Sequence, residues 1–179
     1  MRATMEKSIA RISEMPVSVI VPVLNAQETL QKCLFALAAC ASELTEIIIV
    51  DNGSSDNSFA ISEDFTRSHD KLRIILLREK TQGPSAARNA GAKFATGEWL
   101  LFTDADCLSS HTWISDYRVH FSEAGLGAVA GCIRPYPPTN AVQKAVALFT
   151  LPPATKEILY SGSNLREGFY PTANLAVKK

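Results

Sequence analysis

The chain has 179 residues, 46% of them hydrophobic and 20% charged, a balance typical of one globular domain with a substantial core. Lysine plus arginine and aspartate plus glutamate each number 18, so the net charge is zero, which argues against nucleic acid as a partner because such proteins need excess positive charge. The longest apolar run, residues 33–41, is much shorter than the roughly 20 residues of a membrane-spanning helix, so we expect no span in this chain.

Residues 1–16 form a polar lead-in that lacks the apolar centre of a signal peptide. The four cysteines include no CxxC pair, which argues against a structural zinc site. Cys33 and Cys40 would share one face of a helix and are expected in the core. This cysteine usage favours a reducing, cytoplasmic location, with the cytoplasmic face of a membrane as the alternative.

The first predicted strand, residues 17–23 (VSVIVPV), is apolar at both odd and even positions, as expected of a strand buried on both faces. A helix should follow, because apolar residues recur three and four apart, and Asn25 with Glu28 resembles a capping box at its start. Residues 46–52 (EIIIVDN) form a second predicted strand, and the turn GSSDNS leads into a helix that offers Phe59 and Phe65 to the core.

Residues 72–79 (LRIILLRE) predict a third strand. Pro84 should open the next helix and Gly97 should close it, the order in which these residues usually flank helices. Residues 98–104 (EWLLFTD) are the fourth predicted strand, and a helix is expected over residues 111–123.

Beyond this point we expect a strand over residues 127–136, a helix over 140–149, a loop over 159–170 and a final strand over 171–179. Nearly all strands are apolar and alternate with helices. The pattern therefore predicts an α/β fold with a mostly parallel central sheet and helices on both faces.

Polar side chains collect where the predicted strands end. They are Asn25 and Glu28 after the first strand, Asp51, Asn52 and Asp56 after the second, Gln82, Arg88 and Asn89 after the third, and Asp104 and Asp106 after the fourth. Ligands of open α/β sheets bind beyond the carboxyl ends of the strands. Residues i and i+2 of an extended segment point to the same side, so Asp104 and Asp106 should converge on one site, where a divalent cation with a diphosphate would neutralise them.

Simpler roles remain open for several of these residues. Asn25 and Glu28 suit a helix cap alone, Asp56 suits an N-cap as well as a ligand, and Arg88 suits an ordinary helix surface. A DxD pair alone is a weak signal, but here it ends an apolar strand. The three histidines are scattered and are expected at or near the surface.

Three blocks together resemble the family 2 glycosyltransferases of GT-A fold. They are VSVIVPVLNAQETLQKCL (residues 17–34), IIIVDNGSSDNS (47–58) and GPSAARNAGAKFATGEWLLFTDADC (83–107). The resemblance covers residues 17–179. It implies transfer of a sugar, usually with inversion, from a nucleoside-diphosphate sugar, with UDP-sugars favoured, to an acceptor that is a saccharide, a lipid-linked saccharide or a protein.

The resemblance also implies roles for single residues. The loop after the first strand would line the nucleoside pocket, Asp51 would accept a hydrogen bond from the base, and Asp106 would ligate Mn²⁺ or Mg²⁺. The full donor-binding set it implies is Pro22, Leu24, Asn25, Glu28, Asp51, Gly83, Arg88, Asp104, Ala105 and Asp106.

Departures from the family pattern affect three places. Leu24 stands where many relatives have an aromatic residue, and Asn52 stands where many have a second acid. The family's glycine-rich turn and the acidic pair that supplies its base would come after Lys179, so the chain resembles a truncated domain or a relative without the base. Glu157 and Glu167 are the remaining acids that would serve if this chain transferred sugar by itself.

The expected organisation is a lead-in over residues 1–16, a nucleotide-sugar-binding core over 17–135 and the start of an incomplete acceptor-side subdomain over 136–179. The acceptor-side surface is expected at Arg134, Pro135 and Tyr136 and at residues 161–166.

Three alternative functions are compatible with parts of this pattern. A DxD phosphohydrolase of the haloacid dehalogenase type would use the first aspartate as nucleophile, but Leu108 stands where that motif carries Thr or Val. A nicotinamide-binding fold would need a GxGxxG turn after the first strand, and none is present. The third alternative is a domain that binds a nucleotide sugar without transferring it.

Overall fold

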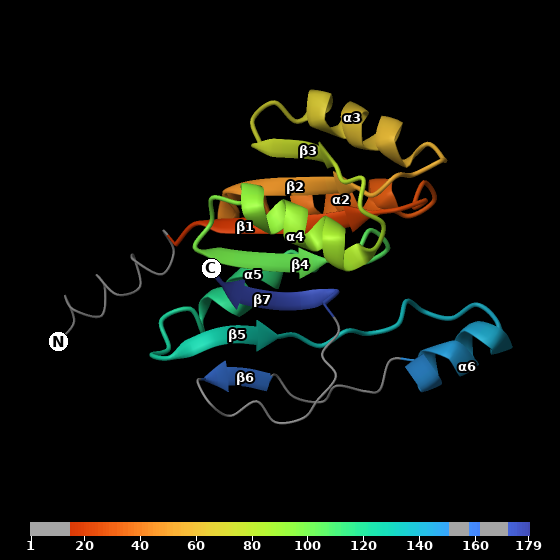
Figure 1. Ribbon diagram of the computed structural model, residues 1–179. Helices are drawn as coiled ribbons and strands as arrows, with labels where there is room; N and C mark the ends of the chain where they lie inside the picture. Colours follow the sequence, from red (N-terminus) through yellow and green to blue (C-terminus); the bar gives the residue numbers. More distant parts are fainter. Residues whose placement is uncertain (1–14, 151–157, 162–171) are drawn as a thin grey trace.

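The computed structural model describes residues 15–150, 158–161 and 172–179, with side chains for residues 15–145 and 172–179. Its described strands form one seven-stranded sheet in the order β3-β2-β1-β4-β7-β5-β6 (Figure 1). The strands are β1 Val17–Val23, β2 Glu46–Asp51, β3 Ile74–Arg78, β4 Trp99–Thr103, β5 Leu126–Ala130, β6 Ile158–Ser161 and β7 Asn174–Lys178.

Strands β1 to β5 run in one direction, whereas β6 and β7 run antiparallel to their neighbours. In the register, Val19 of β1 pairs with Ile47 of β2 and Leu101 of β4, and Ala176 of β7 lies between Leu101 and Val129 of β5. The carboxyl ends of β1 to β5 therefore meet at one edge of the sheet, on the right in Figure 1. The prediction of a mostly parallel sheet is confirmed.

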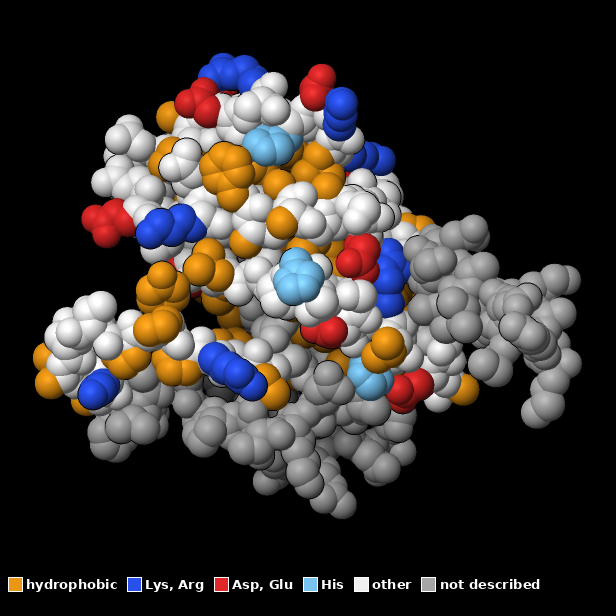
Figure 2. Space-filling model, turned by 180° about the vertical axis from the view of Figure 1, so that it is seen from behind, with side chains coloured by type: hydrophobic (Ala, Val, Ile, Leu, Met, Phe, Trp, Pro, Cys, Tyr) orange, Lys and Arg blue, Asp and Glu red, His pale blue; other side chains and the backbone are white. Residues whose placement is uncertain are grey.

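Helices cover both faces of this sheet, as predicted. The described helices are α2 Leu30–Ala38, α3 Ser58–Ser68, α4 Pro84–Phe94, α5 Trp113–Arg118 and α6 Ala141–Thr150, with a 3-10 turn η1 at Ala41–Glu43. Helix α6 lies beyond the edge of the sheet in Figure 1. Figure 1 shows α4 in front of the strands and α2 and α5 behind them. On the opposite surface, drawn in Figure 2, acidic and basic side chains are interspersed, in keeping with the zero net charge.

The two faces of the sheet build two separate cores, because successive strand residues point to opposite sides. Val19 and Val21 join the core under α2, which also holds the buried thiols of Cys33 and Cys40, as predicted. Ile20 points the other way, into the core under α4. Helix α4 approaches β1 closely at Gly91, where an added Cβ would lie 2.6 Å from Ile20 Cγ2.

The predicted capping box at Asn25 and Glu28 is wrong. Helix α2 begins only at Leu30, its N-cap is Thr29, and no side chain caps it. Asn25 instead adopts the left-handed conformation, with φ of 50°, and its side chain bonds to a loop far along the chain. A local spacing rule could not reveal that partner.

Gly97 does not close the helix predicted before it, because α4 ends at Phe94. Gly97 packs directly against β1: an added Cβ would lie 2.5 Å from the backbone nitrogen of Ser18. Its own N–H donates to Ser18 Oγ at 2.8 Å, and Ser18 Oγ donates to Glu46 Oε1 at 2.6 Å.

Glu46 is fully buried at the edge of the sheet opposite the carboxyl ends. Thr96 donates to Glu46 Oε1 from its backbone N–H at 2.6 Å, and Arg73 Nε lies 3.1 Å from Oε2. Burial alone would raise the pKa of Glu46, yet the hydrogen bonds from Ser18 and Thr96 and the charge of Arg73 outweigh it and hold this pKa below that of an ordinary glutamate.

Three elements after β4 differ from the sequence expectation. Helix α5 covers only six residues of the predicted 111–123 segment. Strand β5 ends at Ala130, whereas the predicted strand continued to Tyr136. Strand β6 occupies the start of the segment predicted as a loop over 159–170. The final strand was predicted correctly as β7.

Strand β7 belongs to the predicted second segment, residues 136–179, but it pairs inside the central sheet between β4 and β5. The division into two segments at residue 135 remains a prediction. The described sheet contains strands from both segments. Among the residues that the structure describes, no helix has the length and apolar character required for a membrane span.

Candidate functional site

A cavity of about 670 Å³ opens at the carboxyl edge of the sheet, and we call it the β1 cavity. The loop after β1, the start of α4 and the residues that follow β4 line it. Of the ten residues in the predicted donor-binding set, this cavity gathers Pro22, Leu24, Asn25, Glu28, Arg88, Asp104, Ala105 and Asp106. Residues from three separate parts of the sequence therefore meet at one place.

Asp51 and Gly83, the other two predicted residues, do not line the β1 cavity. Asp51 is only 4% exposed, and its carboxylate accepts hydrogen bonds from the backbone N–H groups of Gly53 at 3.3 Å and Ser54 at 3.4 Å. Gly83 has φ of 118° and precedes α4. The role of Asp51 toward a base stays a prediction; its observed contacts hold the loop after β2.

Asn52, which the sequence placed among the polar residues at the strand ends and marked as a departure from the family pattern, connects two loops and lines the β1 cavity. Its Nδ2 donates to the carbonyls of Glu79 at 3.0 Å and Thr81 at 2.7 Å, and its Oδ1 accepts from Gly83 N–H at 2.8 Å. An aspartate could accept but could not donate to two carbonyls, so the amide suits this position.

The loops after β1 and β2 are joined by side-chain to backbone hydrogen bonds. Asn25 Oδ1 accepts from Ser55 N–H at 2.9 Å, Ala26 N–H donates to Ser58 Oγ at 2.8 Å, and Gln27 N–H donates to Asp56 Oδ2 at 3.0 Å. These bonds fix one rim of the β1 cavity.

Asp56 was left open as either an N-cap or a ligand, and its contacts show a third role, because it bridges the two loops. Slight desolvation would raise the pKa of its carboxyl, but hydrogen bonds from Ser58 and Gln27 lower it below the ordinary value.

The two aspartates after β4 have different surroundings. The strand ends at Thr103, and the chain turns at Ala105, which is buried. Asp104 Oδ1 lies 2.5 Å from Arg88 Nη2, with the Arg88 side chain only 15% exposed, so the alternative of an ordinary surface arginine is wrong. Asp106 is exposed, and within the described residues its carboxylate contacts only the Cys107 thiol, 3.7 Å from Oδ1.

Two thiols lie close to these carboxylates. Burial, followed by the nearby negative charges, raises the pKa of Cys33 to about 12, and burial raises that of Cys107 to about 11. Cys33 Sγ also donates to the Asp104 carbonyl at 3.5 Å. The protonated form of both thiols is therefore favoured at neutral pH, which makes them poor nucleophiles.

Asp106 offers a hard oxygen ligand of the kind that Mg²⁺ and Mn²⁺ prefer. Within the part of the chain that is described, no group of three or more His, Cys, Asp or Glu side chains is arranged to hold a metal. A cation at Asp106 fits this donor set if it takes most of its ligands from phosphate oxygens and water.

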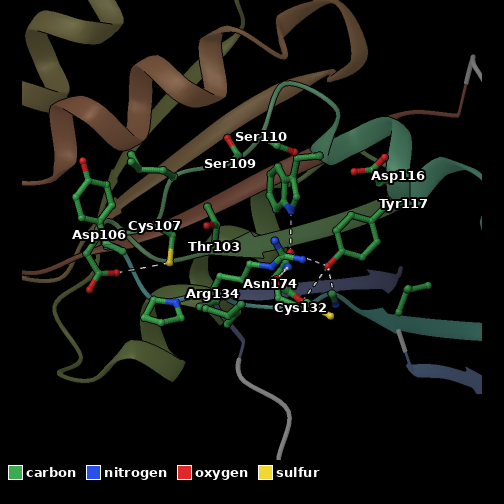
Figure 3. Close-up of a pocket in the computed structure, with 18 of the residues that line it drawn as sticks. Thr103, Asp106, Cys107, Ser109, Ser110, Asp116, Tyr117, Cys132, Arg134 and Asn174 are labelled. Atoms are coloured by element: carbon green, nitrogen blue, oxygen red, sulfur yellow. Dashed lines mark hydrogen bonds between the residues drawn. The ribbon is translucent and has the colours of Figure 1, made fainter. Parts of the chain in front are cut away.

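Figure 3 shows a second cavity of about 820 Å³, which we call the β5 cavity. Helix α5, the segment after β5 and the start of β7 line it. Asp106 is the residue that lines both cavities. A group held in the β1 cavity can therefore meet a group from the β5 cavity next to Asp106.

Asn174 at the start of β7 organises the wall of the β5 cavity, as the dashed lines in Figure 3 show. Its Oδ1 accepts from Trp113 Nε1 at 2.7 Å and from Tyr117 OH at 2.8 Å, and its Nδ2 donates to the Cys132 carbonyl at 2.8 Å. No local sequence pattern predicts this group of residues, because the hydrogen-bonded partners lie 42 to 61 positions apart in the chain.

The predicted acceptor-side residues Arg134, Pro135 and Tyr136 all line the β5 cavity. Residues 162–166 of the other predicted acceptor segment lie outside the described residues, as do Glu157 and Glu167.

Comparison with known proteins identifies a family and relatives of this chain. Residues 18–175 match the model of the family described as Glycosyl transferase family 2. Glycosyltransferase AglE of Haloferax volcanii is 38% identical over 117 residues, which cover 64% of this chain and 38% of that protein.

Two solved structures extend the comparison. The mannosyltransferase PcManGT from Pyrobaculum calidifontis, in complex with GDP-Man and Mn²⁺, matches with a TM-score of 0.61 at 23% identity, covering 74% of this chain and 43% of its own; this likeness shows the fold alone. S. aureus TarS 1-349 in complex with UDP-GlcNAc matches with a TM-score of 0.57 at 26% identity, covering 70% and 37%. The chain spans less than half the length of each of these proteins.

Proposed function

Because the chain belongs to glycosyl transferase family 2, we propose that its β1 cavity binds a nucleoside-diphosphate sugar whose sugar is transferred to an acceptor in the β5 cavity. The observation that carries this proposal is the position of Asp106, an exposed carboxylate at the junction of the two cavities. The likeness to AglE and to TarS with UDP-GlcNAc supports a nucleotide-sugar donor, and we favour a UDP-sugar.

In this proposal Asp104 and Asp106 have different roles. Arg88 neutralises Asp104 and holds it at the cavity wall, where it suits a hydrogen bond from the ribose or the sugar. Asp106 remains available for Mn²⁺ or Mg²⁺, which would stabilise the charge that develops on the leaving diphosphate.

The acceptor would approach the anomeric carbon from the β5 cavity, and we favour transfer with inversion. Its hydroxyl needs a base, and a positioned carboxylate typically contributes about 10²–10⁴-fold. Within the described lining of the β5 cavity, the only acids are Asp106 and Asp116, and Figure 3 places them at opposite ends. That observation favours, as a second candidate, donor binding without transfer by these 179 residues alone.

The phosphohydrolase alternative is excluded by the family match. It also required Asp104 to act as a nucleophile, and this carboxylate is engaged by Arg88 at 2.5 Å.

The proposal is tested by calorimetric titration of UDP, UDP-GlcNAc and GDP-Man with and without Mn²⁺. We expect Asp106→Asn to abolish the Mn²⁺-dependent part of donor affinity, because it removes the carboxylate assigned to the cation. Asp70→Asn, an exposed acid outside both cavities, is the matched control and should bind like the unmodified chain. Donor binding with unchanged Mn²⁺ dependence in Asp106→Asn would contradict the assignment, and no nucleotide binding at all would refute the proposed function.

A further inference from the structure

The β5 cavity contains a cation that nothing in the described structure neutralises. Arg134 lines the cavity, is exposed, and has no hydrogen bond or ion pair among the described residues. A guanidinium presents five donors in a planar fork that matches the oxygens of a phosphate or a carboxylate.

Several other hydrogen-bonding groups of this cavity are engaged with one another, whereas the buried hydroxyl of Ser109 offers a single group without a partner among the described residues. Asn174 takes up the indole N–H of Trp113 and the hydroxyl of Tyr117, and its amide reaches the Cys132 carbonyl. Thr112 Oγ1 donates to Asp116 Oδ2 at 3.0 Å. Recognition of a ligand by charge or by multiple donors in this cavity therefore falls to Arg134.

The acidic lining does not cancel Arg134. Figure 3 shows Asp106 and Asp116 at opposite ends of the cavity, with Arg134 labelled between them in this view. Asp106 faces the β1 cavity as well, and in the proposed function its charge is shared with a divalent cation and a diphosphate. Tyr136, which is 76% exposed two residues after Arg134, adds an aromatic surface to the same rim.

We infer that Arg134 recognises an anionic group on the acceptor, so that the acceptor is a phosphate- or carboxylate-bearing molecule and not a neutral sugar. The inference rests on the proposed function, because only a donor in the β1 cavity makes the β5 cavity an acceptor site. Arg134 would orient the acceptor by a bidentate contact while its hydroxyl lies near Asp106.

Calorimetry with small probes at constant ionic strength tests the inference. Glycerol 3-phosphate and glucuronate supply the two anionic groups, and glycerol and glucose are their neutral counterparts. We expect the unmodified chain to bind at least one anionic probe more tightly than its neutral counterpart, and the better of the two identifies phosphate or carboxylate. Arg134→Gln should lose about ten- to a hundredfold in affinity for that probe, since it removes a charge-assisted hydrogen-bonding group.

Matched variants distinguish the contribution of the planar guanidinium donors of Arg134 from that of its positive charge. Arg134→Lys keeps the charge but not the planar donors and should bind at an intermediate affinity. Lys144→Gln removes one exposed positive charge on α6, outside the cavity lining, and should bind like the unmodified chain. An equal loss in Lys144→Gln would overturn the inference in favour of general surface charge, and so would anionic binding unchanged in Arg134→Gln or the absence of any anionic binding.

Saturation with UDP and Mg²⁺ before the titration separates the two cavities. The anionic probe should still bind; complete displacement by UDP would mean that Arg134 contacts the donor diphosphate and would overturn the inference. Failure of UDP itself to bind would instead refute the proposed function, so the two failures are distinguishable.

Discussion

Asp104 and Asp106 are separated by one residue, yet their surroundings give them different chemistry. Arg88, whose side chain is 15% exposed, contacts one carboxylate and leaves the other in water. The Arg88 Nε is buried without a partner of its own, so the guanidinium is held mainly through Asp104 and by packing within α4 and the cavity wall. Replacing one member of such a partly buried ion pair leaves the charge of the other member without a partner, which destabilises the folded state.

Arg88→Met should lower the free energy of unfolding by about 1–3 kcal/mol, because Asp104 loses a charged hydrogen-bond partner while the length of the side chain is kept. Urea denaturation measures the change. The control is Arg67→Met, since Arg67 and its partner Asp64 are 72% and 73% exposed and such surface pairs contribute about 0–1 kcal/mol. Equal losses in the two variants would show that the Arg88–Asp104 pair has no special weight.

At the scale of elements, helix α4 positions Arg88 and Pro84 at the β1 cavity. Gly91 sets the distance between this helix and the sheet, because it has no side chain. Gly91 is buried against Ile20 of β1 and Val50 of β2. Because the helix lies so close to the strands, its first turn reaches the carboxyl edge where Asp104 is found.

Gly91→Ala should destabilise the protein by about 1–3 kcal/mol, since its methyl group would lie 2.6 Å from Ile20 Cγ2 and must push α4 away from β1. This cost exceeds the gain in helix propensity, which is about 1 kcal/mol. Thermal unfolding, followed by circular dichroism, tests the change. The control is Gly127→Ala in β5, where an added Cβ meets nothing within 4 Å and stability should hold or rise. A Gly91→Ala variant as stable as this control would mean that the helix can shift without cost.

At the scale of the whole molecule, the sheet carries its cavities at one edge and a buried carboxylate at the other. Glu46 connects β1, β2 and the segment between α4 and β4 through Ser18 and Thr96. Since the pKa of Glu46 is lowered in the folded state, its contribution to stability is present above its unfolded-state pKa and is lost as the pH falls through the folded-state pKa.

Glu46→Gln should therefore be less stable than the unmodified chain at neutral pH, by about 1–3 kcal/mol for the loss of charge-assisted hydrogen bonds. The difference should shrink as the solution is acidified below the ordinary range of a glutamate. Denaturation at a series of pH values gives both curves. Glu98→Gln, which removes an exposed acid 3.6 Å from Lys178, should run parallel to the unmodified chain at every pH. If the difference in free energy of unfolding between Glu46→Gln and the unmodified chain did not change with pH, Glu46 would contribute through its shape and not through its ionisation.

Much of this architecture could be predicted from the sequence, because its signals are local. Strand β1 was predicted with its observed limits, since both faces of the sheet are covered and its residues are apolar at both parities. The polar strand ends predicted the β1 cavity for the same reason: topology brings the carboxyl ends of parallel strands together.

What the sequence analysis missed depends on partners far apart in the chain. The turn at Asn25 is fixed by Ser55, and the wall of the β5 cavity is fixed by Asn174, whose contacts reach Trp113 and Cys132. No periodicity or capping rule connects such positions. The place of β7 between β4 and β5 was missed for the same reason.

That place of β7 has a consequence for the order in which the protein can be assembled on the ribosome. Synthesis delivers β4 and β5 well before residues 174–178, the strand that must lie between them. Until those residues emerge, one edge of β4 and one edge of β5 have unpaired backbone groups, and such edges are prone to pair with other chains. The nascent chain can therefore complete its β3-β2-β1-β4 half early, while the wall of the β5 cavity forms only after β7 has emerged.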